Sequence, residues 1–188
     1  VLELIELLTG SVTEQEANLL YIAVTTDTGC FQYANTNAAT LRAAARLLEL
    51  GADNRKVSME FFRKISRARM ALIGHIYSGM CFFRGGQIAI AVVTRALIDA
   101  LQATEDDCDD IAGLPGRADG VVVSVTIREL TDGRSKISVR TTPEVDSCAI
   151  CAVYGGGGHK MASGCTLTCD PETAVEKILA AIDQVWPA

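Results

Sequence analysis

The sequence lacks any long apolar run, although 49% of its 188 residues are hydrophobic. Its apolar stretches, such as Ile88 to Val93, are far shorter than the ~18 residues that a membrane-spanning helix needs. It also lacks an excess of basic charge, because 17 Lys and Arg stand against 23 Asp and Glu. The net charge of −6 disfavours a protein that holds long nucleic acid through bulk positive charge. We expect a globular protein of one domain or two small ones.

The chain also lacks a charged and then apolar leader, and its seven cysteines are an odd number. Both features favour a reducing, cytoplasmic location. The first residue is Val1 rather than Met, inside an expected helix that runs to Leu8, which is typical of a piece of a longer protein. Eight basic residues between Arg42 and Arg69 could form a local phosphate-binding face, although two solvated faces of opposite charge explain the pattern equally well.

Helix signals dominate the first third of the chain. A hydroxyl-rich start at 11–16 precedes an apolar helix that we expect to stop at 25–29. Asn37 is placed to cap a second helix, 38–50, which Gly51 ends. A third helical stretch is expected from about Asn54 to Ile76, with a domain boundary near Ser66 inside it.

From residue 80 onward the pattern changes to alternating strands. Two hairpins are predicted around the turns 84–86 and 131–134, where glycine can supply a positive φ. The remaining expected elements are a helix at 94–103, an acidic connector at 104–116, a short helix from Asp146 or Ser147, a strand at 165–169 and a closing helix at 171–185 with proline in its first turn. The second part of the chain is therefore predicted to be mixed α and β around a sheet.

The most unusual segment is the glycine run 155–158, followed by His159 and Lys160. A backbone without Cβ atoms lets a ligand approach closely, and its N–H groups can surround phosphate oxygens. His159 could then donate a hydrogen bond or act as a general acid, and Lys160 could serve as a point charge. A flexible linker is the alternative. A linker, however, would not need the small residues that continue at 162–164.

Two further positions could carry chemistry. Asp27 follows an apolar helix, where its carboxylate could bind Mg²⁺ or Mn²⁺, although the segment also fits an ordinary helix-ending turn at Gly29. Arg140 lies two residues after Ser138 and so on the same face of a strand. Its guanidinium could hold a phosphate with two hydrogen bonds, and an exposed strand arginine is the alternative.

The cysteines allow a zinc site to be drawn, because Cys148 and Cys151 form a CxxC motif and Cys165 and Cys169 follow. We interpret them instead as small core thiols, since the first pair lies on a short apolar helix and the second pair on a strand. His75 is flanked by apolar residues and is interpreted as a core or linker histidine.

Two segments together resemble the DHH/DHHA1 phosphoesterases. Residues 26–31, with Asn35-Thr36 after them, are similar to the last metal-binding motif of that family. The glycine and histidine segment 155–159, with Ala162-Ser163-Gly164, resembles the signature of its DHHA1 domain. The resemblance implies an α/β fold in which 1–65 is the mostly helical end of a DHH catalytic domain, 66–78 is a helical linker and 79–188 is a mixed-sheet DHHA1 substrate-binding domain.

The resemblance also implies a function. The members that this chain is most similar to are short bacterial enzymes that hydrolyse oligoribonucleotides of a few residues, 3′-phosphoadenosine 5′-phosphate, or linear and cyclic dinucleotides. Two Mn²⁺ ions are implied as cofactors in the full-length enzyme, with Asp27 as a metal ligand. Asp27 and His159 are implied as catalytic residues. The implied substrate-binding residues are Ser138, Arg140, Gly156, Gly157, Gly158, His159 and Lys160. A short oligonucleotide or nucleotide is the implied partner, no membrane is, and homodimerisation is left open.

The sequence departs from the family pattern in its metal ligands. Its only histidines are His75 and His159, so it has no adjacent His pair, and no Asp-x-Asp stands near the start. One carboxylate cannot hold two metal ions. We therefore expect the other ligands upstream of Val1 and expect the chain to be inactive alone. The alternative is a non-catalytic module that binds nucleotides or nucleic-acid ends; a relative acting on polyphosphate or long single-stranded DNA is disfavoured by the net charge.

Overall fold

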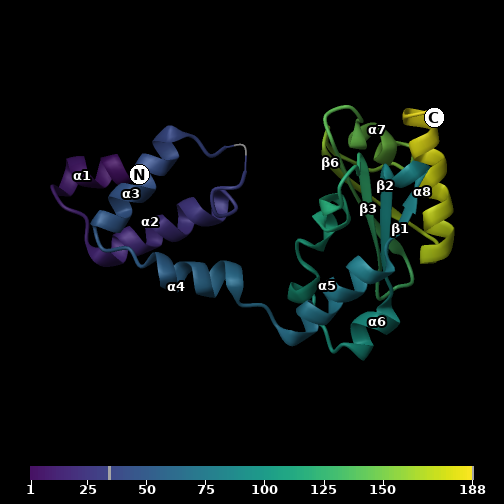
Figure 1. The fold of residues 1–188 in the computed structure, drawn as a ribbon, viewed down its shortest axis with the longest axis horizontal. Coiled ribbons are helices and arrows are strands. Elements are labelled where there is room, and N and C mark those ends of the chain that lie inside the picture. The colour runs from purple at the N-terminus through teal and green to yellow at the C-terminus, as the bar shows by residue number, and fades with distance from the viewer. Residues whose placement is uncertain (34, 188) are drawn as a thin grey trace. The chain divides into compact units, whose positions relative to one another are not determined.

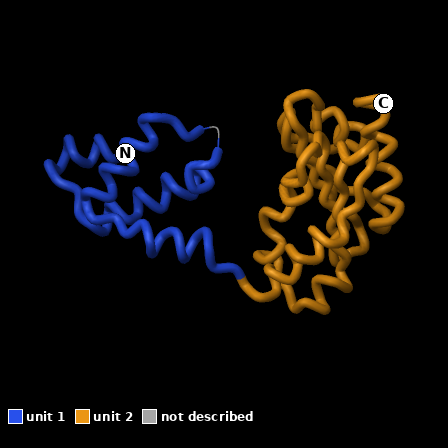
Figure 2. The backbone as a smooth tube through the Cα atoms, viewed as in Figure 1, with its two compact units in different colours: residues 1–65 blue, residues 66–188 orange. Residues whose placement is uncertain are grey.

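The computed structural model describes residues 1–33 and 35–187. The chain divides into two compact units at Ile65 and Ser66, called unit 1 (residues 1–65) and unit 2 (residues 66–188) (Figure 2). No described helix combines the length and the apolar composition that crossing a bilayer requires.

Unit 1 is built from helices: α1 (Leu2–Thr9), α2 (Glu14–Asp27), α3 (Ala38–Glu49), α4 (Asn54–Ser58) and a π-helical turn (Met59–Arg63). The predicted helix starts are confirmed. Thr13 and Glu16 form a capping box at the start of α2, and Asn37 accepts hydrogen bonds from the N–H groups of Ala39 and Thr40 at the start of α3. A small core joins these helices, made mainly of Ala17, Tyr21, Ala44, Leu47, Ala52 and Val57.

The expectation of one helical stretch from Asn54 to Ile76 is wrong. The chain becomes extended at Lys64, and a new helix, α5 (Arg67–Gly79), starts after Ser66. The Ser66 hydroxyl accepts a hydrogen bond from the N–H of Arg69, 2.9 Å away. Serine interrupts a helix here because its side chain offers the backbone this local alternative. The structure groups α5 with unit 2.

Unit 2 contains a six-stranded sheet in the order β1-β2-β3-β4-β6-β5. Its strands are β1 (Cys81–Phe83), β2 (Ile88–Val93), β3 (Val123–Glu129), β4 (Ser135–Thr141), β5 (Gly157–His159) and β6 (Ala162–Leu167). The β2 and β3 strands are parallel, and all other neighbours are antiparallel. Both predicted hairpins, β1–β2 and β3–β4, are therefore present, and the predicted mixed-sheet α/β fold class is confirmed.

The helices of unit 2 that follow α5 lie where the sequence predicts them. They are α6 (Arg95–Ala100), α7 (Ser147–Ala152) and α8 (Pro171–Val185), and 3₁₀ turns occupy Arg84–Gly86, Asp106–Cys108, Ile111–Gly113 and Pro115–Arg117. One boundary differs from the prediction. The last strand starts at Ala162 rather than Cys165, because Ala162 and Gly164 pair with β4 on one side and with β5 on the other.

The two faces of the sheet are covered differently. One face, called the apolar face, packs Val125, Ile127, Ile137 and Val139 against α7 and α8, and Figure 1 shows α8 lying along the sheet. The opposite face is called the polar face. Its β2 and β3 part is covered by α5, α6 and the connector 101–117, but β4, β6 and β5 carry exposed or half-buried residues there. The polar face is therefore open over half of the sheet.

Candidate functional site

The alternation of side chains along β4 places polar residues on the open side of the sheet. Ile137 and Val139 are fully buried at 0% exposure beneath the helices of the apolar face. Lys136, Ser138 and Arg140 point the other way, because successive residues of a strand face opposite sides. These three side chains are exposed or half-buried, so a ligand can reach them.

The strand register brings the glycine and histidine segment onto this same face. Arg140 pairs with Ala162 of β6, and Ala162 pairs with His159 of β5. Directly paired residues share a face, so Arg140 and His159 lie in one row with only a small alanine between them. Since neighbouring strands are about 4.8 Å apart, their backbones are separated by about 10 Å. At this separation, two long side chains can both contact a phosphate-sized ligand.

The next row of paired residues on this face contains two glycines. Ser138 pairs with Gly164, and Gly164 pairs with Gly157. Neither glycine has a side chain, so the Ser138 hydroxyl stands beside exposed backbone of β6 and β5. The face therefore carries no side chain of β5 or β6 in the row next to Arg140 and His159.

The backbone of the β5–β6 hairpin is held in place by α7. The N–H of Ser147 donates to the Lys160 carbonyl at 2.8 Å, and the Ser147 hydroxyl donates to the His159 carbonyl at 3.1 Å. Ser147 itself is completely buried. The Thr141 hydroxyl, 3.3 Å from the Lys160 carbonyl, adds a contact from β4. These bonds fix the backbone of His159 and Lys160 while both side chains remain exposed.

The structure requires glycine at some, but not all, of the four positions before His159. Gly155 has a φ of 70°, which favours glycine. A Cβ on Gly156 would lie 2.3 Å from the Gly164 carbonyl oxygen, and one on Gly158 would lie 2.5 Å from that of Ala162. Gly157 has no positive φ, and a Cβ there would meet nothing within 4 Å. Its lack of a side chain thus has no explanation inside the protein and is consistent with a ligand against its backbone.

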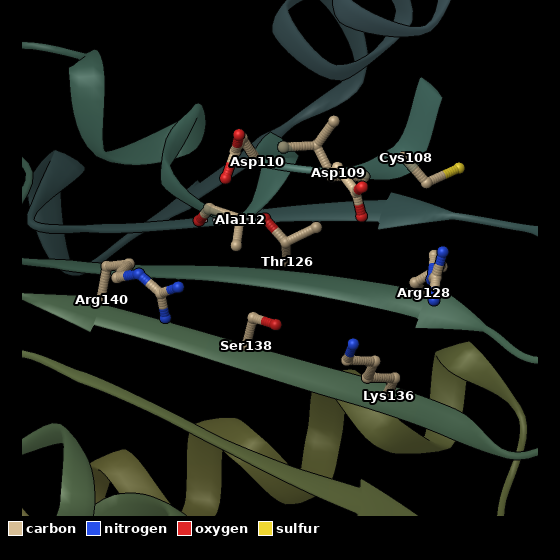
Figure 3. Close-up of a pocket in the computed structure, with 10 residues that line it drawn as sticks. Cys108, Asp109, Asp110, Ala112, Thr126, Arg128, Lys136, Ser138 and Arg140 are labelled. Atoms are coloured by element: carbon tan, nitrogen blue, oxygen red, sulfur yellow. Dashed lines mark hydrogen bonds between the residues drawn. The ribbon is translucent and has the colours of Figure 1, made fainter. Parts of the chain in front are cut away.

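A groove runs along the polar face between β3, β4 and the connector 108–112 (Figure 3). Its volume is about 200 Å³. Arg128, Lys136 and Arg140 supply cations, Thr126 and Ser138 supply hydroxyls, and Asp109 and Asp110 stand on the connector side. The Arg140 guanidinium donates to the neighbouring Val139 carbonyl at 3.0 Å. Within the described parts of the chain, neither Lys136 nor Arg140 forms an ion pair, so both charges are free to meet an anion.

The predicted binding residues thus fall into three groups. Ser138, Arg140, Gly157 and His159 share the open polar face, while Lys160 lies in the exposed turn after β5. Gly156 and Gly158 pack against β6 instead. The alternative of a flexible linker is wrong, because Gly157–His159 adds an edge strand to the sheet.

Sequence reasoning missed two groove cations, Lys136 and Arg128. Lys136 could have been found from the alternation Lys136-Ile137-Ser138-Val139-Arg140, which predicts one face for all three polar residues. Arg128 is directly opposite Lys136 on β3, a pairing that depends on the hairpin register.

Asp27 is the last residue of α2 in unit 1, and its side chain is exposed. Its carboxylate accepts a hydrogen bond from the Asn35 side chain at 3.0 Å. It borders a groove of about 1060 Å³ that is lined by residues of α1, α2 and α3. Three successive residues after it, Gly29, Cys30 and Phe31, have positive φ values. Cys30 and Phe31 are strained in this conformation, and such strain clusters at functional sites.

The donor set around Asp27 does not fit a two-ion manganese centre. Among the residues that the structure describes, no group of three or more His, Cys, Asp and Glu side chains could hold a metal ion. Asp27 contributes a carboxylate with one amide beside it, whereas two ions need several anionic oxygen ligands. The described residues of this chain therefore do not provide the ligand set of two metal ions.

The cysteines differ in their burial. Cys151 and Cys165 are buried, as core thiols should be, whereas Cys148 and Cys169 are half-buried. The hydrogen bond with the Cys151 thiol, together with burial, raises the pKa of Cys165 well above its ordinary value, so this thiol stays protonated. His75 lies exposed on α5, so it is not a core histidine, and its alternative interpretation as a linker histidine stays a prediction.

The fold and the site define a class. An α/β domain that leaves cations, hydroxyls and exposed glycine backbone on an open sheet face has the chemistry that suits a small anionic ligand. The comparison with known families then identifies the family of the chain. The family described as the DHHA1 domain matches residues 85–186, and the chain belongs to this family.

Individual relatives agree with this assignment. The chain is 36% identical over 184 residues to the bifunctional oligoribonuclease and PAP phosphatase NrnA of Thermus thermophilus, a match that covers 97% of this chain and 54% of that protein. It is 32% identical to the protein of the same name from Mycoplasma genitalium, over 81% of this chain and 46% of the relative. The chain thus spans about half the length of these curated relatives.

A solved structure is similar as well. The crystal structure of an exopolyphosphatase-related protein from Bacteroides fragilis matches with a TM-score of 0.83 and 25% identity. The match covers 92% of this chain and 51% of that chain. The resemblance to DHH/DHHA1 proteins that the sequence motifs indicate is therefore confirmed.

Proposed function

We propose that this chain is the substrate-binding part of a DHH-type phosphoesterase that hydrolyses short oligoribonucleotides, 3′-phosphoadenosine 5′-phosphate or linear and cyclic dinucleotides. The observation that carries the proposal is the shared open face of Arg140, Ser138, Gly157 and His159. The names of the relatives, which act as oligoribonucleases and PAP phosphatases, support the same class of substrate.

Each residue of the polar face has a role in this proposal. The Arg140 guanidinium binds the phosphate with two parallel hydrogen bonds, and the Ser138 hydroxyl donates a third. The Gly157 backbone allows the ligand to approach without a steric barrier. His159 donates a proton or hydrogen bond to a phosphate oxygen, and Lys160 adds positive charge at the sheet edge.

The catalytic part of the proposal concerns the full-length enzyme. There, Asp27 would be one of several ligands to two Mn²⁺ ions, and the protein would act in the cytoplasm. Bound metal ions would supply an activated water and neutralise charge on the phosphate. We infer that the present 188 residues bind substrate but do not hydrolyse it, because they offer one carboxylate from that ligand set.

A non-catalytic module that binds nucleotides or nucleic-acid ends is the second candidate. The observation in its favour is the donor set itself, since no metal-binding group of three residues occurs among residues 1–33 and 35–187. Incubation of the purified chain with Mn²⁺ and a diribonucleotide tests whether the chain hydrolyses a nucleotide or only binds it. We expect no release of mononucleotide, and measurable turnover would contradict the proposed inactivity of the chain.

The binding proposal is tested by calorimetric titration of the chain with 3′-phosphoadenosine 5′-phosphate. Arg140→Ala should weaken binding about 10- to 100-fold, because a hydrogen bond to a charged group contributes roughly 1.5–3 kcal/mol. His159→Ala should also weaken it.

Arg134→Ala is the matched control, since Arg134 is an exposed arginine in the β3–β4 turn that pairs with Asp132. The control should bind like the unaltered chain. Equal affinity of the unaltered chain and the Arg140→Ala variant would refute the site.

A further inference from the structure

The groove of the polar face extends beyond the predicted site. Lys136 lies on the same strand and the same face as Arg140, four residues earlier. A strand rises about 3.3 Å per residue, so the two Cα atoms are about 13 Å apart. Both side chains nevertheless line the one groove of about 200 Å³, with Ser138 between them (Figure 3). The groove therefore has a cation near each end.

Of the two cations at the Lys136 end of the groove, Arg128 is paired with an acid of the described chain and Lys136 is not. Lys136 pairs directly with Arg128 across β3 and β4, and two like charges in such a position destabilise a sheet. Glu105 accepts from Arg128 at 2.7 Å. No described acid forms an ion pair with Lys136, whose side chain is exposed. An anion bound between Lys136 and Arg128 would remove this repulsion.

We propose that Lys136, with Arg128 beside it, forms a second phosphate subsite, so that the groove binds two phosphates of one nucleotide ligand. The inference rests on the proposed function, in which Arg140 and His159 bind the first phosphate. Lys136 is then a specificity-determining residue that favours ligands with two phosphates over those with one.

The rest of the groove suits the part of a nucleotide between its phosphates. Thr126 is 3% exposed, and its hydroxyl lies 3.4 Å from the Ala112 carbonyl on the connector. The carboxylates of Asp109 and Asp110 stand on the connector side, away from β4 (Figure 3). They can accept hydrogen bonds from sugar hydroxyl or base amino groups. They would repel a phosphate, which directs phosphates toward the strand side.

The test compares ligands by calorimetric titration of the 188-residue chain. The ligands are 3′-phosphoadenosine 5′-phosphate, which carries two phosphates, and adenosine 5′-monophosphate, which carries one. Lys136→Ala should weaken binding of the two-phosphate ligand about tenfold, which corresponds to about 1.4 kcal/mol. It should change binding of the one-phosphate ligand by less than about twofold, and Lys136→Arg should retain the preference because the charge remains.

Lys177→Ala is the matched control, because Lys177 is an exposed lysine on α8, the helix that covers the apolar face. If Lys136→Ala leaves both affinities unchanged, or weakens both equally, the second subsite is overturned while Arg140→Ala still tests the first. If the unaltered chain binds neither ligand, the proposed function fails and the subsite fails with it.

Discussion

The two faces of the sheet in unit 2 are made by the same strands but serve different purposes. On β4, Ile137 and Val139 face the helices, whereas Ser138 and Arg140 face the open groove. Stability therefore depends on one set of alternate residues, and the proposed ligand binding depends on the other. Substitutions at two neighbouring residues of a strand can therefore affect different properties, because successive side chains point to opposite faces of the sheet.

The strand pair β5 and β6 shows the same contrast. On the apolar face, β6 contributes Ser163, Cys165 and Leu167, all buried. The Ser163 hydroxyl donates to the Ser147 carbonyl at 2.6 Å and so joins β6 to α7. On the polar face the same strand presents only Ala162, Gly164 and Thr166. The packed side thus holds the hairpin in position, and the bare side leaves room for a ligand.

The largest expected effect comes from the packed side of β4. Ile137→Ala should lower the free energy of unfolding by about 2–5 kcal/mol, because it removes a buried side chain and leaves a cavity. Ser138→Ala, one residue later, should change it by less than about 0.5 kcal/mol. Urea unfolding of the two variants measures both values. Similar losses in both would contradict the division of roles between the faces.

A second test separates two glycines of β5. Gly158→Ala should destabilise the protein by about 1–3 kcal/mol or more, since its φ of 148° and the nearby Ala162 carbonyl oppose a Cβ. Gly157→Ala has open space and should unfold at nearly the same urea concentration as the unaltered chain. Its binding of 3′-phosphoadenosine 5′-phosphate should nevertheless weaken. Unchanged binding would show that no ligand approaches the Gly157 backbone.

The smallest effect concerns α8, which covers the apolar face. The Asp170 carboxylate caps this helix by accepting from the N–H of Thr173 at 2.9 Å, and this hydrogen bond lowers the pKa of Asp170 below its ordinary value of 3.8. The cap therefore stabilises the fold above that pH, and its contribution is lost as the pH falls through the lowered pKa.

Asp170→Asn should consequently reduce the unfolding midpoint slightly at neutral pH, and the difference from the unaltered chain should disappear in acid. Urea titrations across this pH range provide the measurement. A difference that stays constant with pH would assign the stabilisation to the geometry of the cap rather than to its charge.

Much of the fold could be predicted because its signals are local. Asn37 and Pro171 mark helix starts by chemistry that acts within one turn of helix, and the two hairpins are marked by glycine at their turns. The break before Ser66 escaped prediction, since residues 54–76 have helix-forming composition on both sides of it. The hydroxyl cap that starts α5 is supported by the contact of Ser66 with Asp107, which lies 2.5 Å away and 41 residues further along the chain.

The candidate site was predicted only in part, for a related reason. Arg140 and Ser138 share a face by their spacing alone, but nothing in the spacing relates them to His159. The role of Asp27 as a metal ligand stays a prediction from the family resemblance. Lys136 and Arg128 escaped notice because an exposed strand cation is common and only the groove gives it a role.

By itself, the sequence determined the helix caps, the hairpin turns, the alternation along β4 and the membership of the DHHA1 family, because each depends on residues close together or on motifs in order. Only the tertiary structure decided that β5 pairs at the sheet edge and brings His159 into line with Arg140. That register arises from hydrogen bonds between strands distant in the chain and from α7, which fixes the hairpin through Ser147. The spacing of residues along the sequence does not predict such hydrogen bonds, so the candidate site is formed only in the folded sheet.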